Sequence, residues 1–383
     1  MSGVPSRPRV AILTHMVTPY RVPILEFVAR QFDVTVFYSG RESNRAEWEG
    51  IERELKLARV KRSWGVTLKY WKRVAGTPIG VGFFHITPGY FLDLLRWRPD
   101  AIISTEMGFR SLVALLYGTV FRKPVWVWWG GTVHTEGAVG ALRRWFRRIV
   151  ARWAPGWISY GRTSTEYLLS LGIDRRRILE IQNCVDECTF AARPPRAFDV
   201  SPRPVLLHAG QMIPRKGIAQ LLEAAKALQD EGATFSVLLV GNGSERQALE
   251  EHATRLGLAN VHFRPGVPAS QMPAVYQSAD LYVFPTLRDA WGLVVNEAML
   301  SGIPVLASVY AGCAAELLTP EAVFDPLDPE DFKAKLGRGL QGSLPRPELS
   351  RLKTSGEVGS MIVEELGRAL RPGPRADLIP ADQ

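Results

Sequence analysis

Residues 205–228 read VLLHAGQMIPRKGIAQLLEAAKAL, and this stretch decides the fold. An apolar run of strand length ends at Gly210. A helical pattern follows, with Leu221, Ala225 and Leu228 on one side. Short apolar runs that alternate with helix-length segments are typical of parallel strands buried in βα units. The stretch therefore predicts one strand–turn–helix unit of a parallel α/β sheet.

The same alternation runs through the whole chain of 383 residues. The predicted strands of the first half are Val10–Thr14, Val34–Tyr38, Ala101–Ser104, Val125–Trp128 and Trp157–Tyr160. Those of the second half are Val205–Ala209, Phe235–Val240, Val261–Phe263, Leu281–Phe284 and Pro304–Ala307. We expect an α/β protein with two Rossmann-like, doubly wound domains facing across a cleft, and ligands beyond the carboxyl ends of the strands.

A proline-rich stretch interrupts this alternation near the middle of the chain and marks the predicted linker. The expected parts are an N-terminal domain over 1–190, the linker over 191–204 and a C-terminal domain over 205–355. Residues 356–383 are expected to form a helix, able to cross back to the N-terminal domain, and a tail. Two domains also fit the length, since a domain spans about 150 residues.

The composition excludes several classes of protein. Three cysteines, Cys184, Cys188 and Cys313, argue against a disulfide framework and fit a reducing compartment. No apolar run reaches the roughly 20 residues that a membrane span needs, and residues 1–9 lack the apolar core of a signal peptide. We therefore expect a cytoplasmic protein, and neither a multi-span membrane protein nor a secreted mini-protein.

Positive charge is concentrated in the first half. Residues 1–190 hold 28 Lys and Arg against 16 Asp and Glu, whereas residues 191–383 hold 19 against 22. Two basic segments with interleaved aromatic residues, Arg53–Arg73 and Leu142–Trp153, could lie on an anionic membrane surface. Alternatively, the apolar stripe of Leu142–Trp153 packs on its own sheet and the arginines are solvated. No nucleic-acid motif accompanies the charge, so nucleic acid is not an expected partner.

The loop Gly210–Gly217 has the features of a phosphate site. It lies between a predicted strand and a predicted helix, where helix N–H groups are free, and it carries Arg215 and Lys216. An ordinary βα loop with solvated basic residues would look similar. A second glycine-bounded turn with Gly241 and Gly243 allows close approach to a ligand, although ordinary turns use the same residues.

A third motif spans residues 289–299, with Asp289 and Glu297 on either side of Gly292. A helix that starts near Gly292 would direct its first N–H groups into the cleft, where they could hold phosphates. The two carboxylates could accept hydrogen bonds from two sets of hydroxyls on an extended ligand. The alternative is an N-cap aspartate followed by a solvated helix glutamate.

These motifs, followed by Ser301–Val305, resemble glycosyltransferase family 4 in order, spacing and strand context, over roughly residues 180–325. That family consists of retaining enzymes of the GT-B fold, which bind a nucleoside-diphosphate sugar. The resemblance implies that Glu297 holds the ribose hydroxyls and Asp289 the hydroxyls of the donor sugar. It also implies that Lys216 neutralises the diphosphate, with Arg215 and Gln211 beside it in the phosphate loop.

The backbone of the third motif is expected to meet the phosphates, at Gly292, Leu293 and Val294. In the N-terminal half the resemblance is less specific. His134, in the loop after the strand Val125–Trp128, matches a family histidine that reaches the donor sugar, and His15 is a second candidate.

The chain departs from the family pattern in three places. Asp289 stands where glutamate is usual, and Gln211 stands where arginine is frequent. The first loop, residues 15–21, lacks a Gly-Gly pair.

The resemblance implies a retaining glycosyltransferase of the hexosyltransferase type, which needs no metal ion or other cofactor. It would move a sugar from a nucleotide donor to a glycan or lipid-linked acceptor, in cell-envelope or exopolysaccharide biosynthesis. Two alternatives stay open: a nucleotide-sugar epimerase of the same fold, and a catalytically degenerate binding or scaffold subunit. A Rossmann dehydrogenase is disfavoured because neither half has G-x-G-x-x-G after its first strand.

Overall fold

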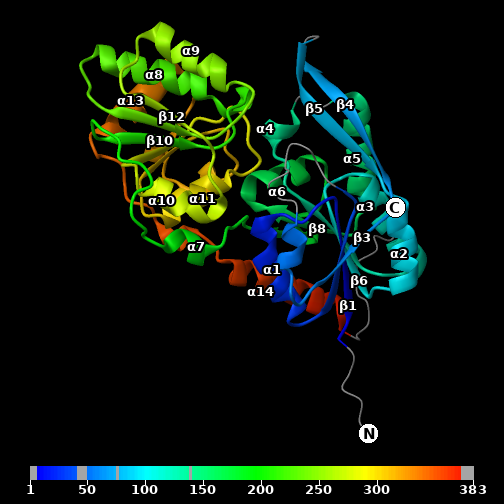
Figure 1. Cartoon of the computed structure of the whole chain (residues 1–383). Helices are drawn as coiled ribbons and strands as arrows, with labels where there is room; N and C mark the ends of the chain where they lie inside the picture. The colour runs from blue at the N-terminus through cyan, green and yellow to red at the C-terminus, as the bar shows by residue number, and fades with distance from the viewer. Residues whose placement is uncertain (1–6, 41–49, 75–76, 138–139, 372–383) are drawn as a thin grey trace.

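The computed structural model describes residues 7–40, 50–74, 77–137 and 140–371, with side chains in these ranges except at residues 69–84. Two parallel sheets, each covered by helices on both faces, form two lobes (Figure 1). The predicted fold class is therefore confirmed.

The first sheet has seven parallel strands in the order β3-β2-β1-β6-β7-β8-β9. They are β1 (Arg9–Thr14), β2 (Asp33–Tyr38), β3 (Arg59–Arg62), β6 (Ala101–Thr105), β7 (Val125–Trp129), β8 (Gly156–Tyr160) and β9 (Ile178–Ile181). All five predicted strands of this half are present with their bounds shifted by at most one residue. The two edge strands, β3 and β9, were not predicted.

The second sheet has six parallel strands in the order β12-β11-β10-β13-β14-β15. They are β10 (Val205–Ala209), β11 (Ser236–Val240), β12 (Val261–Arg264), β13 (Leu281–Phe284), β14 (Val305–Ser308) and β15 (Val323–Phe324). The five predicted strands are again confirmed, and only the two-residue edge strand β15 is additional.

The helices cover both faces of each sheet because successive strand residues point to opposite faces. In β1, Val10 and Ile12 pack with α1 (Val22–Ala29), whereas Ala11 and Leu13 pack on the other side. The helices on that other side are α2 (Gly89–Trp97), α3 (Phe109–Phe121), α5 (Ala141–Trp153) and α6 (Gly161–Ser170). In the second domain α7 (Glu187–Ala191), α10 (Met272–Tyr276), α11 (Leu293–Leu300) and α12 (Ala314–Leu317) cover one face, and α8 (Ile218–Asp230), α9 (Arg246–Leu256) and α13 (Pro329–Leu340) the other.

The last helix, α14 (Ser355–Leu370), returns to the first domain. Its residues Val358, Ile362 and Leu366 are spaced four apart and enter the same core as α1. The chain enters the second domain before the predicted linker of residues 191–204, since Val185 already belongs to that domain's core. The chain passes between the domains once before Val185 and once before α14, and hydrogen bonds connect these two segments. The Gln182 side chain donates to the Arg351 carbonyl at 3.0 Å and accepts from the Lys353 N–H at 2.7 Å.

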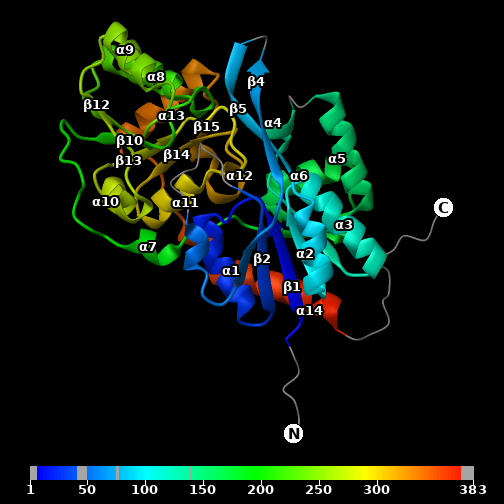
Figure 2. The same cartoon turned by 45° about the vertical axis from the view of Figure 1, so that its right-hand side comes forward.

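An antiparallel hairpin, β4 (Val66–Val74) with β5 (Thr77–Ile86), stands apart from both sheets. Both views place it on the first domain, rising beside the second lobe (Figure 2). This hairpin was not predicted, and it occupies part of the basic segment Arg53–Arg73. None of the described helices combines the length with the apolar character that a membrane span requires.

Candidate functional site

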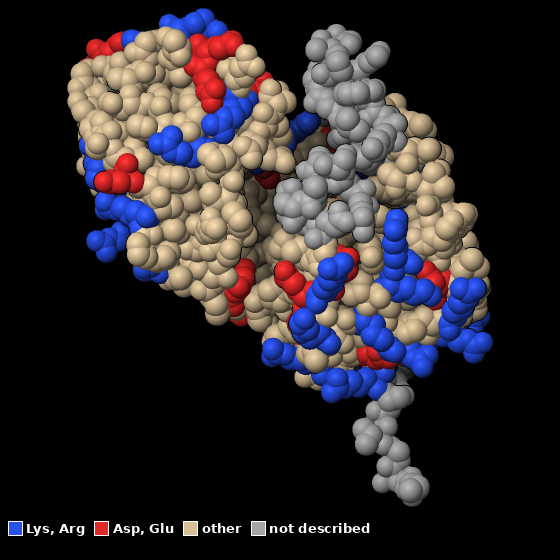
Figure 3. Space-filling model, in the orientation of Figure 1, with Lys and Arg blue, Asp and Glu red and all other residues tan. Residues whose placement is uncertain are grey.

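A groove separates the two lobes (Figure 3), and the carboxyl end of the second sheet opens towards it. Strand β10 ends at Ala209, and Gly210 follows with φ 153°, a backbone conformation that favours glycine. The loop then forms a short 3₁₀ turn, Pro214–Lys216, and Gly217 at φ 66° starts helix α8. A Cβ on Gly217 would lie 1.9 Å from the carbonyl oxygen of Pro285. The loop Gly210–Gly217 therefore packs closely against the loop that follows β13.

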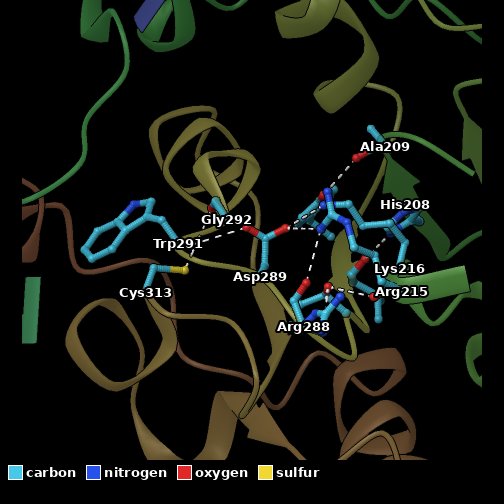
Figure 4. A network of polar contacts seen from close by, with 12 residues as sticks. His208, Ala209, Arg215, Lys216, Arg288, Asp289, Trp291, Gly292 and Cys313 are labelled. Carbon is cyan, nitrogen blue, oxygen red and sulfur yellow. Dashed lines mark hydrogen bonds and ion pairs between the residues drawn. The ribbon is translucent and has the colours of Figure 1, made fainter. Parts of the chain in front are cut away.

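Asp289 brings the phosphate loop and the third motif together (Figure 4). Its Oδ2 accepts hydrogen bonds from Lys216 Nζ at 2.7 Å and Arg215 Nη1 at 3.0 Å. The Lys216 side chain is 11% exposed and that of Asp289 17%, so this pair is largely shielded from water. Lys216 Nζ also lies 4.8 Å from the centre of the Phe284 ring. The three charges predicted from two separate motifs therefore form one cluster.

Electrostatics hold Asp289 in the ionised form. Burial alone would raise the pKa of its carboxyl, but Lys216 and Arg215 outweigh burial and lower the pKa to about 2. Burial lowers the pKa of Lys216, although Asp289 acts in the opposite direction. Nearby His208, buried in β10, has its pKa lowered to about 4, chiefly by burial. The lysine and aspartate charges therefore depend on each other.

Helix α11 begins at Leu293, directly after Gly292, as the third motif predicts. Gly292 has φ 100°, and a Cβ there would lie 2.6 Å from the Phe284 ring. The N–H groups of Leu293 and Val294 belong to the first turn, which has no acceptor within its own helix. The Asp289 carboxylate lies just before this turn and bonds to the Trp291 N–H at 3.3 Å. The helix start thus lies beside the cation cluster.

Glu297 lies one turn into α11 and is partly buried. Tyr276 Oη, from the buried end of α10, donates to Glu297 Oε2 at 2.7 Å. Burial raises the pKa of Glu297 to about 7, although the Tyr276 hydrogen bond acts against this rise. The two carboxylates of the third motif therefore have different environments. Asp289 forms ion pairs with two cations, whereas Glu297 accepts a hydrogen bond from a neutral hydroxyl.

Gly241 and Gly243 lie against the phosphate loop. A Cβ on Gly241 would be 1.8 Å from the Gly210 carbonyl oxygen, and one on Gly243 would be 2.1 Å from that of Met212. The Met212 N–H also donates to the Asn242 carbonyl at 2.9 Å. These two glycines thus allow two loops to pack closely against each other. From the sequence alone, this packing role could not be distinguished from a role in which the backbone approaches a ligand. Gln211, next to Gly210, is exposed.

His134 reaches this region from the first domain. It lies on the short helix α4 (Val133–Glu136), which Figure 1 shows on the side facing the second lobe. Its exposed ring meets the Tyr310 ring of the second domain edge to face, with centroids 5.3 Å apart. The Tyr310 carbonyl in turn accepts from the Asp289 N–H at 3.1 Å. The structure therefore brings His134, from the opposite side of the cleft, close to the segment that is bonded to Asp289. His15, the second candidate, is buried and stacks on His85.

Three contributors to this region were not predicted. Tyr276 and Tyr310 lie outside the motifs, and only the position of Tyr310 just after a strand could have indicated it. Arg288, next to Asp289, offers its carbonyl to Arg215 Nη1 at 3.1 Å.

The basic helix α5 differs in part from expectation. Val150 packs in the core, but Leu142 and Trp145 of the expected apolar stripe are 78% and 59% exposed. Conversely, Arg147 is buried, where it pairs with Glu136 and lies 5.0 Å from the Trp129 ring. One interpretation of the sequence was that the whole apolar stripe of Leu142–Trp153 packs on the sheet and that every arginine is solvated. This interpretation is therefore wrong.

Comparison with known proteins gives these features a family context. Residues 195–356 match the sequence family described as Glycosyl transferases group 1. The chain is 28% identical, over 286 residues, to a 2-deoxystreptamine glucosyltransferase of Streptomyces kanamyceticus, covering 68% of this chain and 73% of that protein. It is 25% identical, over 315 residues, to the sulfoquinovosyl transferase SQD2 of Arabidopsis thaliana, covering 75% of this chain and 58% of that protein.

The fold is also found among solved structures. The Anabaena protein Alr3699/HepE, solved in complex with UDP and glucose, superposes with a TM-score of 0.65 at 17% identity, over 94% of this chain and 95% of that one. This likeness shows that the chain has the GT-B fold. The stretch that matches Glycosyl transferases group 1, residues 195–356, contains the cation cluster and both motif carboxylates.

Proposed function

We propose that this protein is a retaining glycosyltransferase that moves a hexose from a nucleoside-diphosphate donor to a glycan or lipid-linked acceptor in envelope or exopolysaccharide synthesis. The observation that carries the proposal is the cluster of Lys216, Arg215 and Asp289 beside the first turn of α11. Cations and free N–H groups in one place form a site for a diphosphate. The family match and the UDP-bound structural neighbour support the same assignment.

In this proposal the donor lies along the carboxyl edge of the second sheet. Glu297, held by Tyr276, accepts hydrogen bonds from the ribose hydroxyls, and Asp289 accepts from hydroxyls of the sugar. Lys216, Arg215 and the first N–H groups of α11 face the diphosphate. Because Lys216 and Arg215 are already held by Asp289, the site is preorganised for negative charge.

Transfer exchanges one bond at the anomeric carbon for another. The bond from this carbon to the diphosphate oxygen breaks, and the diphosphate leaves with the electron pair. The acceptor oxygen attacks from the same face, and its proton passes to an oxygen of the departing phosphate. Lys216 and Arg215 stabilise the growing negative charge, which is the largest contribution expected from such a site. We propose that no metal ion takes part and that His134 contacts the sugar from the opposite domain.

Donor binding is the first test of this proposal. Calorimetric titration with UDP-, GDP- and ADP-sugars should show binding of one nucleotide class, and Lys216→Ala should weaken it by about tenfold or more, because a charged hydrogen bond is lost. The matched control is Lys226→Ala, which removes a lysine paired with Asp230 on the surface of α8. Its donor affinity should equal that of the wild type.

Three results would contradict the assignment. Unchanged donor affinity in Lys216→Ala would remove the phosphate site from this loop. Absence of binding by the folded wild type would favour a degenerate scaffold subunit. Release of free nucleotide and an epimerised sugar, with no acceptor-linked product, would favour an epimerase.

We further propose that the enzyme works on an anionic membrane surface through α5. Trp145 and Leu142 project from this helix, and its exposed arginines are Arg143, Arg144, Arg148 and Arg152. The C-terminal half of the neighbouring helix α3 adds exposed Val120, with Trp153 Nε1 bonded to Thr119 across the two helices. Apolar side chains flanked by arginines suit the interface of an anionic bilayer. In the segment Arg53–Arg73, Trp64 is 71% exposed, while the side chains of Tyr70 and Trp71 lie outside the described residues.

Sedimentation with vesicles tests this surface. The wild type should bind phosphatidylglycerol-containing vesicles and not pure phosphatidylcholine ones. Replacing Leu142 and Trp145 together by serine should reduce binding by about tenfold or more, since burial of each large apolar side chain is worth about 1.5–3 kcal/mol. Leu349→Ser, which changes an exposed leucine of the second domain, is the control. Equal binding by the double variant and the wild type would exclude α5 as the contact.

A further inference from the structure

Arg21 is a cation at the carboxyl edge of the first sheet, in the short turn between β1 and α1. Two residues from neighbouring strand ends hold it in place. Its Nε donates to Tyr160 Oη at 2.8 Å, and its guanidinium lies 4.9 Å from the centre of the Trp128 ring. An arginine held at Nε and along one face is fixed in position, and its terminal fork stays available for a planar anion.

The anionic partner of this fork is missing from the described chain. No described carboxylate forms an ion pair with Arg21, whereas Arg147 pairs with Glu136 and both Lys216 and Arg215 pair with Asp289. Glu106 contributes to the electrostatics of Arg21, but its own ion pair is with Arg110, at 3.2 Å. Buried or half-buried charges are normally paired, so the lack of a carboxylate partner for Arg21 calls for an explanation.

Arg21 lies close to the boundary between the two domains. Its partner Tyr160 precedes Gly161, at which a Cβ would lie 2.1 Å from Glu316 Oε1 and 2.6 Å from the Trp291 ring. Both of these residues belong to the second domain, and Trp291 comes two residues after Asp289. An anion on the fork of Arg21 would therefore lie on the first-domain side of the cleft, across from the cation cluster proposed to hold the donor.

The backbone beside Arg21 carries a second unusual feature. Glu106, at the carboxyl end of β6, has φ 62°, a conformation that side-chain-bearing residues rarely adopt. The other described non-glycine residues with positive φ follow helices or precede a strand in a turn, where this conformation is common. Strain of this kind concentrates at ligand sites. The Glu106 carboxylate and the Arg21 fork thus present opposite charges along one strand edge.

We propose that Arg21 binds a phosphate or carboxylate group of the acceptor, so that the acceptor of this enzyme is an anionic molecule. The inference rests on the proposed function, because it takes the first domain as the acceptor side. The donor diphosphate has its own cations in Lys216 and Arg215, which leaves Arg21 for a second anion. Arg21 is then a binding residue that selects charged acceptors over neutral ones.

Calorimetry with two kinds of ligand tests this role. The protein is first saturated with the nucleoside diphosphate that it binds, and inorganic phosphate or glucuronate is then titrated as the acceptor probe. The wild type should bind at least one probe. Arg21→Gln should weaken that binding by about tenfold or more, because a bidentate charged contact is lost, and should leave the nucleotide affinity within about twofold of wild type.

Two further variants make the result decisive. Arg21→Lys keeps the charge but loses the fork, so intermediate probe binding is expected, and this variant still gives an answer if Arg21→Gln does not fold. Arg176→Gln removes a 90% exposed arginine in the turn before β9, at the opposite edge of the same sheet, and should bind both ligands as the wild type does.

The failures can be told apart. A nucleotide affinity that falls about tenfold in Arg21→Gln would assign Arg21 to the donor diphosphate and overturn the proposal. Probe binding that is absent in the wild type, or unchanged in both Arg21 variants, would also overturn it. If no nucleotide binds the wild type, the proposed function fails, and titration of the probes without nucleotide still shows whether Arg21 holds an anion.

Discussion

Asp289→Asn should destabilise the protein and abolish most sugar transfer. The substitution removes the charge that compensates Lys216, whose side chain is only 11% exposed, and it leaves the lysine beside the ring of Phe284. Because the pKa of Asp289 is lowered to about 2, the ionised form stabilises the fold by about 2 kcal/mol relative to an unfolded chain with the usual value near 4. A neutral asparagine forfeits this stabilisation and leaves a buried cation without its partner.

The pH dependence follows from the direction of this shift. A lowered pKa gives stability that is fully present above about pH 4 and is lost as the pH falls towards 2. Urea unfolding should therefore show a lower midpoint for Asp289→Asn than for the wild type at pH 7, with a difference that narrows below pH 4. Asp230→Asn, which breaks the more exposed pair with Lys226, should change the midpoint little. An unchanged midpoint for Asp289→Asn would show that Lys216 does not depend on this carboxylate.

Glu297→Gln should have the opposite effect on stability while removing donor binding. The pKa of Glu297 is raised to about 7 by burial, so ionisation of this carboxyl at higher pH costs about 3 kcal/mol of folding free energy. The favourable contribution of a raised pKa is present below the unfolded value near 4.5 and is lost as the pH rises through 7. At pH 8 the glutamine variant should be the more stable protein, with the Tyr276 hydrogen bond retained by the amide oxygen.

The affinity for the donor should change with pH as the Glu297 carboxyl ionises. The wild type should bind its donor more tightly as the pH rises from 6 to 8, because an ionised carboxylate is the stronger acceptor for ribose hydroxyls. Glu297→Gln should bind about tenfold or more weakly at pH 8 and lose this pH dependence. Calorimetry across the pH range measures both effects, with Glu251→Gln on the exposed face of α9 as the control. A pH profile that persists in Glu297→Gln would assign the titration to another group.

The sequence predicted ten strands, all of them inside the two sheets except the edge strand β12, because buried parallel strands are continuous apolar runs. It did not predict β3, whose residues Arg59–Arg62 are mostly basic and lie at an edge where most of these side chains meet water. Strand β15 has only two residues and leaves no pattern to read. These strands were not predicted because they form by pairing with an adjacent strand of the sheet, and their own residues carry no apolar pattern.

The candidate site shows the same division. Residues within one motif, such as Arg215, Lys216 and Glu297, could be predicted because a strand–loop–helix unit positions them locally. Their partners could not, since Tyr276 reaches Glu297 from α10 and Asp289 reaches Lys216 across 73 positions of the sequence. Arg147 likewise could not be predicted to be buried. Its burial depends on the ion pair with Glu136 and on tertiary packing, and the spacing of apolar residues along a helix shows neither.

The return of α14 to the first domain has a consequence for how the chain is made. The face of the first sheet that packs against α1 is completed by Val358, Ile362 and Leu366, which follow the whole second sheet in the sequence. A ribosome therefore synthesises the strands of the first sheet before those of the second sheet, and the helix that covers them after both. Until α14 has been made, this apolar surface of the first domain is open to water and to chaperones.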